Sequence, residues 1–85
     1  MVLVTFRNPK EKLTAMFGSF FKTVELAKEF IKADAEHYAA TRGFGNHSKL
    51  VNVDPNTQDY FELRKYKGAV RGKGTVELVY QYFVV

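Results

Sequence analysis

Cysteine is absent from this chain of 85 residues, and that absence excludes several kinds of protein. A disulfide framework, a thiolate metal site and a cysteine nucleophile all need a thiol group. Packing, or association with another chain, must therefore stabilise the folded state. Because a chain without cysteine fits a reducing compartment, we expect the protein to be cytoplasmic.

Long apolar runs are missing as well. Residues 1–7 lack the basic start and the apolar stretch of a secretory signal. Nowhere does the sequence approach the roughly 18 consecutive apolar residues that a membrane-spanning helix needs. We therefore expect neither secretion nor a membrane partner.

Apolar residues nevertheless make up 46% of the chain, and its aromatic residues are eight Phe and five Tyr. Such rings bury a large area while few torsions are fixed, so a chain of this composition is expected to fold. Its length leaves no room for a second core. We therefore expect one domain over residues 1–85.

Alternation of apolar and polar residues predicts strands in both halves of the chain. Residues 2–7 and 13–21 are expected to be the first two strands, joined by a hairpin loop at residues 9–12. Residues 49–53 are predicted to be a short third strand. The segments 60–66 and 75–85 are predicted to pair as a hairpin with a glycine-containing, basic tip.

A helix of about 18 residues is predicted between the second and third strands, with Thr23 as its N-cap and Arg42 and Gly43 at its C-terminal end. Its apolar residues recur with the i, i+3/i+4, i+7 spacing of a face that packs on a sheet. That stripe comprises Val24, Ala27, Ile31, Ala35 and Tyr38, flanked by Leu26 and Phe30. Asp34 falls beside the stripe, where we expect it to have a structural role, at the edge of the stripe or in a hydrogen bond to a neighbouring loop.

These elements give the order β-β-α-β-β-β and predict a two-layer α+β fold, with one amphipathic helix on a mostly antiparallel sheet of about five strands. A single helix can cover one face of the sheet, so the other face must meet water or a partner. The last strand has apolar residues on both sides, which is typical of a central strand or of an interface. A homodimer is therefore an open alternative.

Positive charge is concentrated in one segment of the chain. Residues 60–74 hold five basic residues and one acidic residue, whereas the rest of the chain holds eight of each, so this segment accounts for the net charge of +4. Cations that follow a phosphate backbone, beside rings that can stack on bases, are typical of nucleic-acid binding. The predicted nucleic-acid-binding residues are Arg64, Lys65, Lys67, Arg71, Lys73, Tyr60 and Tyr66.

No segment of the sequence matches a catalytic or nucleotide-binding motif completely. Residues 68–75 resemble a phosphate-binding P-loop, but the glycine spacing is one residue short and a predicted strand, not a helix, follows. His37 and His47 have no third ligand beside them, and no two of the nine acidic residues are spaced to suggest a shared buried site. We therefore expect no enzyme activity, no cofactor and no metal.

Two classes of function stay open. The first is a non-enzymatic protein that contacts nucleic acid through the basic C-terminal hairpin. The second is a protein-binding module, such as a small inhibitor or adaptor, that uses the uncovered sheet face or the edge of the last strand to capture an acidic or apolar partner. In that case the basic residues would protect and solubilise an exposed strand. A short chain with its own Met1 also suits the accessory proteins of phages and mobile elements.

Overall fold

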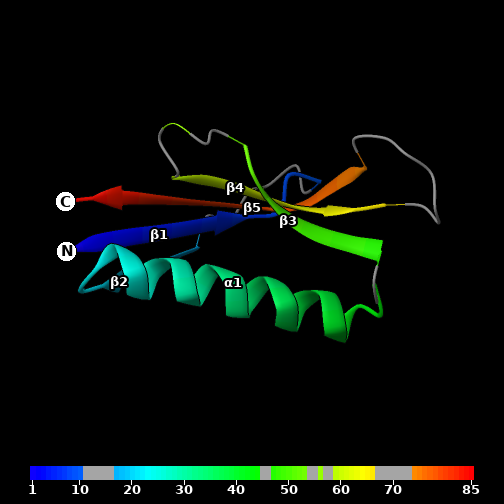
Figure 1. Ribbon diagram of the computed structural model, residues 1–85, viewed down its shortest axis with the longest axis horizontal. Helices are drawn as coiled ribbons and strands as arrows, with labels where there is room; N and C mark the ends of the chain where they lie inside the picture. Colours follow the sequence, from blue (N-terminus) through cyan, green and yellow to red (C-terminus); the bar gives the residue numbers. More distant parts are fainter. Residues whose placement is uncertain (11–16, 45–46, 54–55, 57–58, 67–73) are drawn as a thin grey trace.

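One helix and five strands make up the computed structural model, which describes residues 1–10, 17–44, 47–53, 56, 59–66 and 74–85 (Figure 1). The elements are β1 (Val2–Arg7), β2 (Phe17–Phe21), α1 (Val24–Thr41), β3 (Ser48–Asn52), β4 (Tyr60–Lys65) and β5 (Thr75–Val84). Both the predicted order β-β-α-β-β-β and the α+β class are confirmed. The part of the second strand predicted at residues 13–16 lies outside the described residues.

The five strands form one antiparallel sheet in the order β2-β1-β5-β4-β3. The last strand, β5, is central and pairs with β1 on one side and β4 on the other, which explains why its residues are apolar on both faces. It is therefore not an edge strand of the described sheet, and its central place does not support the expectation that its edge captures a partner. The edges of the described sheet are β2 and β3.

The helix begins and ends where its capping residues predict. The Thr23 side-chain oxygen accepts a hydrogen bond from the Leu26 backbone N–H at 3.2 Å. At the other end Gly43 has φ +69°, a left-handed conformation that suits glycine. Arg42 is the C-cap and not part of the last turn, and its guanidinium lies 4.9 Å from the centre of the Tyr38 ring.

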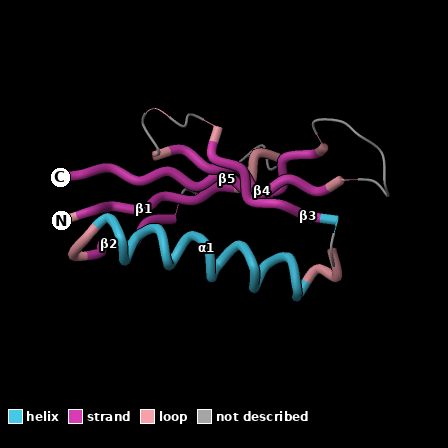
Figure 2. The backbone as a smooth tube through the Cα atoms, viewed as in Figure 1, coloured by secondary structure: helices cyan, strands magenta, loops and turns pink. Residues whose placement is uncertain are grey.

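The core lies between α1 and one face of the sheet (Figure 2). Ala27, Ile31 and Ala35 are the buried residues of the helix, spaced four apart as the stripe predicts. They pack with the face of the sheet that includes Val4 and Tyr80. Leu26, predicted to flank the stripe, is instead exposed.

Among the described residues, no helix combines the length and apolar character needed to cross a membrane.

A hydrogen bond joins the helix to the central strand. The hydroxyl of Tyr80, a fully buried residue of β5, donates to Asp34 Oδ2 on α1 at 2.6 Å. Burial, and after it this hydrogen bond, raises the pKa of Tyr80 above its ordinary value. The structural role predicted for Asp34 is confirmed, but its partner is a strand tyrosine and not a loop.

Replacing Tyr80 by Phe tests the contribution of this hydrogen bond. The change removes the hydroxyl but keeps the ring, so the half-buried Asp34 carboxylate loses a donor. We expect the free energy of unfolding to fall by about 1–3 kcal/mol in urea titrations at neutral pH. Tyr82→Phe, on the same face of β5, is the matched control and should cost less. Equal losses in the two variants would contradict a special role for the Tyr80 hydroxyl.

The raised pKa of Tyr80 also predicts a pH dependence of stability. Tyr80 holds its proton more tightly in the folded state than in the unfolded chain, where its pKa is near the ordinary 10.0. Its contribution is therefore complete below about pH 10 and is lost as the pH rises further. Between about pH 10 and pH 12, the free energy of unfolding should fall more steeply for the native chain than for Tyr80→Phe. Parallel curves for the two proteins would show that folding does not raise the pKa of Tyr80.

Candidate nucleic-acid interface

The sheet face opposite the helix is uncovered by any described element and carries a row of apolar side chains. Because Val2 and Val4 pack toward the helix, Leu3 points to the other face. The pairing registers place Leu3 directly between Phe20 of β2 and Phe83 of β5. The two phenylalanines are 61% and 42% exposed, respectively. Two exposed aromatic rings therefore flank one leucine on this face.

Cationic side chains lie further along the same face, toward the hairpin that joins β4 and β5. Two positions beyond Leu3, Thr5 pairs with Gln81, which in turn pairs with Tyr60. In the next row Arg7 pairs with Val79, and Val79 pairs with Glu62. Beyond a register irregularity in β4 and β5, the last row holds Arg64 beside Lys49 of β3. The uncovered face thus has an aromatic end and a basic end.

Arg64, the first of the predicted cations, lies on this face and forms an ion pair. Its Nε donates to Glu62 Oε1 at 3.1 Å, and its Nη2 donates to the same oxygen. This hydrogen bond is the largest cause that raises the pKa of Arg64 above its ordinary value. The guanidinium therefore stays charged, but part of its field is offset by the neighbouring carboxylate.

Lys65, the next predicted cation, lies on the opposite face of β4. Its Nζ is 4.9 Å from the centre of the Phe44 ring, in the turn after α1. Adjacent strand residues point to opposite faces, so Arg64 and Lys65 cannot contact one ligand surface together. The prediction that they act as one patch receives no support from their placement.

The two predicted tyrosines are half-buried and lie apart. Tyr60 stands in the row that contains Thr5 and Gln81, next to the aromatic end of the uncovered face. Tyr66 follows β4, where its backbone N–H donates to the His47 carbonyl at 2.6 Å. Its ring lies beside Gly74, so close that a β-carbon on Gly74 would be 3.0 Å from it. The other predicted cations, Lys67, Arg71 and Lys73, lie outside the described residues.

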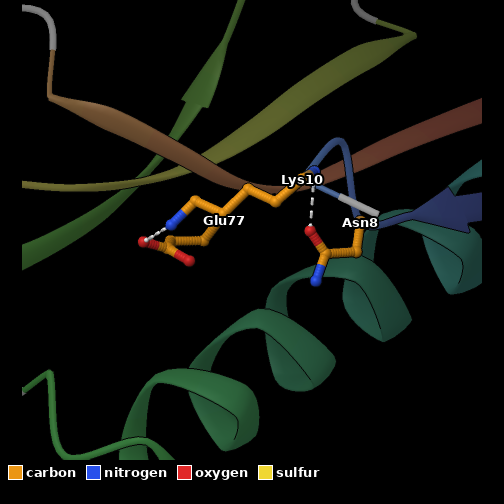
Figure 3. A network of polar contacts seen from close by, with 3 residues as sticks. All are labelled: Asn8, Lys10 and Glu77. Carbon is orange, nitrogen blue, oxygen red and sulfur yellow. Dashed lines mark hydrogen bonds and ion pairs between the residues drawn. The ribbon is translucent and has the colours of Figure 1, made fainter. Parts of the chain in front are cut away.

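A second ion pair neutralises an acidic residue near the basic end. Lys10 Nζ donates to Glu77 Oε1 at 2.8 Å, and Glu77 is buried at the start of β5 (Figure 3). The lysine is held by a turn in which its backbone N–H donates to Asn8 Oδ1 at 2.9 Å. This carboxylate therefore adds little negative field to the surface around the hairpin.

The two histidines are exposed. His37 lies on the solvent side of α1, and His47 lies just before β3. No group of three or more metal-ligating side chains occurs among the described residues.

The aromatic row is the feature that sequence reasoning missed. Phe20 and Phe83 are 63 positions apart in the printed sequence, and only the pairing of β2, β1 and β5 brings them to either side of Leu3. The apolar second face of the last strand was the one available signal. A comparison of the chain with protein-family models, curated proteins and solved structures gave no match.

Two glycine substitutions test the local geometry of the basic hairpin. Gly74 and Gly43 have almost the same positive φ, +68° and +69°, but a β-carbon on Gly74 would lie 2.8 Å from the Lys65 carbonyl oxygen, whereas one on Gly43 would meet nothing within 4 Å. We expect Gly43→Ala to cost about 1 kcal/mol through backbone strain alone. Gly74→Ala should lower the free energy of unfolding distinctly more. A smaller loss of stability in Gly74→Ala than in Gly43→Ala would contradict the close approach of Gly74 to the Lys65 carbonyl oxygen.

Proposed function

We propose that the protein is a non-enzymatic binding protein whose uncovered sheet face binds single-stranded nucleic acid. Bases would stack on Phe20 and Phe83, and phosphates would lie near Arg7, Lys49 and Arg64. The observation that carries the proposal is the exposed row of Phe20, Leu3 and Phe83 on a face that also bears cations. Lys67, Arg71 and Lys73 lie outside the described residues, and we propose phosphate contacts for them as well.

Exposed rings on a sheet favour a single strand over a duplex. A base offers its flat face for stacking only when it is not stacked inside a helix, and sheets that present aromatic residues use this mode of recognition. Each stacked base contributes about 1–3 kcal/mol and every base has such a face, so binding of this kind is tolerant of sequence. Leu3 between the rings adds apolar contact without competing for hydrogen bonds.

The distribution of charge fits a strand that runs along the face. Three two-residue steps separate the row of Leu3 from the row of Arg64, a distance of about 20 Å along the strands. Arg7 lies between these rows, and the exposed Lys49 lies at the basic end. With Glu62 paired to Arg64 and Glu77 paired to Lys10, the acids nearest this end are already neutralised.

A protein partner is a second candidate, and one observation favours it. Met1, Val84 and Val85 lie at the same end of the sheet as Phe83 and are 65–72% exposed. Together with Phe20 they give this end an apolar character that an apolar partner or a second copy of the chain would cover. Binding of that kind should depend little on salt, in contrast to binding of phosphates.

The aromatic row gives the sharpest test. We expect Phe20→Ala combined with Phe83→Ala to weaken the binding of labelled single-stranded RNA or DNA by about tenfold or more in fluorescence anisotropy titrations. Leu26→Ala, which removes an exposed apolar side chain from α1, is the matched control and should leave affinity unchanged. Equal affinity of the double variant and the native chain would contradict stacking on these rings.

Neutralising the cations separates the phosphate contacts from the stacking. A variant with Arg7, Lys49 and Arg64 changed to Gln should bind more weakly, and its affinity should depend less on salt, whereas Lys65→Gln, on the opposite face, is the matched control and should bind as the native chain does. Duplexes titrated in parallel should bind less well than single strands. Weak binding that is equal in the triple variant and the native chain would end the nucleic-acid proposal. Light scattering of the same samples would identify a homodimer, which the protein-partner candidate predicts.

We also propose a cytoplasmic setting, because a chain without cysteine needs no oxidising compartment for its stability.

A further inference from the structure

A groove of about 800 Å³ lies on the helix side of the sheet, away from the uncovered face. It runs between the later part of α1 and the strands β3 and β4, which pass over the C-terminal half of the helix in Figure 1. Its floor is apolar and includes the almost fully buried Ile31, Ala35 and Leu63, with Leu50 and Phe61 partly exposed. The groove therefore offers apolar contact beside the edge of a sheet.

The outer edge of β3 borders this groove, and its hydrogen-bonding pattern can be derived. Val53 N–H donates to the Tyr60 carbonyl at 3.0 Å, and the His47 carbonyl accepts from Tyr66 N–H at 2.6 Å. In an antiparallel pair, residues that exchange hydrogen bonds with the neighbouring strand alternate with residues whose backbone groups point away. The odd-numbered residues of β3 therefore bond to β4, and the backbone groups of Ser48, Leu50 and Asn52 point outward.

The same three residues line the groove, so the open backbone groups and the apolar floor are side by side. Asn52 adds a further feature, because its Oδ1 is buried and has no hydrogen-bond partner among the described residues. A buried acceptor without a donor is unfavourable, and an N–H group entering the groove would satisfy it.

The border of the groove is mainly basic. Lys28 and Lys32 line it from α1, and Glu36 is its one acidic lining residue. Lys49 also borders the groove, but its side chain lies on the opposite face of β3, beside Arg64. Lys28 and Lys32 are four residues apart on the helix and so project from the same side. A short edge strand that carries lysine resists pairing with a second copy of itself, but attracts a strand of opposite charge.

We propose that the β3 edge and this groove bind an extended peptide in which apolar and acidic residues alternate. The peptide would add to the sheet as a sixth strand, exchanging backbone hydrogen bonds with Ser48, Leu50 and Asn52. Its apolar side chains would enter the groove toward Leu50 and Phe61, while its acidic side chains would point to the opposite face of the sheet, beside Lys49. This inference does not rest on the proposed binding of nucleic acid, with which it shares only Lys49.

The backbone groups distinguish a peptide from a small amphiphilic acid as the occupant. A fatty acid would use the apolar floor and one lysine but would leave the outward N–H and C=O groups of β3 in water. A peptide strand pairs those groups while its alternate side chains fill the groove, so it uses every feature of the site. We therefore take decanoate as the competing occupant in the test.

The direct experiment follows individual backbone amides. A fluorescent peptide of alternating valine and glutamate is titrated into the full chain, and hydrogen exchange of β3 is then measured by NMR. We expect the amides of Leu50 and Asn52, which point outward, to become protected on binding. Those of Lys49 and Val51, already bonded to β4, should change little. Binding without this alternating protection, absence of binding, or perturbation of the groove by decanoate alone would each overturn the proposal.

Side-chain variants test the groove as the peptide site independently. Ala39→Phe should abolish binding of the valine–glutamate peptide, since its ring would occupy the groove, whereas Ala33→Phe, on an exposed part of the same helix, should bind as the native chain does. Lys49→Glu should weaken binding several-fold and Lys22→Glu should not. A peptide of alternating valine and lysine should bind less well than the acidic one. Unchanged affinity in Ala39→Phe, with its fold verified by circular dichroism, would refute the groove as the site.

Discussion

The contact between one helix and the central strand determines how the rest of this domain is exposed. The fully buried Tyr80 of β5 packs in the core and donates a hydrogen bond to Asp34 of α1. Ala27 and Ala35 are small enough to let the helix approach the sheet closely on either side of Ile31. Because the one helix packs on one face of a five-stranded sheet, two surfaces are left: the opposite face, which is exposed at Phe20 and Phe83 although Val79 on it is buried, and the groove beside β3.

These two surfaces differ in chemistry, and the difference suggests different ligands. The opposite face brings Phe20 and Phe83 to either side of Leu3 and places Arg7, Arg64 and Lys49 further along. Aromatic rings and cations on one face of a sheet suit bases and phosphates. The groove combines an apolar floor, outward backbone groups and lysines, which suit the main chain and side chains of an acidic strand. A protein that binds ligands at both surfaces would connect a nucleic acid to a protein that presents an extended peptide segment.

The fold could be predicted from the sequence because its signals are local. Alternation in residues 2–7, the Thr23 and Gly43 caps and the stripe of Ala27, Ile31 and Ala35 each depend on neighbouring residues, and each was confirmed. The uncovered face and the groove beside β3 could not be predicted in this way, because both depend on which strands pair. The basic segment suggested one patch, but Arg64 and Lys65 point to opposite faces and Arg64 is paired with Glu62. Likewise, nothing in the sequence shows that β3 is an edge or that Asn52 Oδ1 is buried.

We propose that the uncovered face, and not the helix side, binds a single strand of nucleic acid. Mapping of amide chemical shifts during titration with a short single-stranded RNA tests it most directly. Binding at the uncovered face should shift the amide resonances of Leu3, Phe20 and Phe83 and of the cationic rows of the same face, and should leave those of α1 unchanged. Shifts that follow α1 or the β3 groove, or no shifts at all, would contradict it.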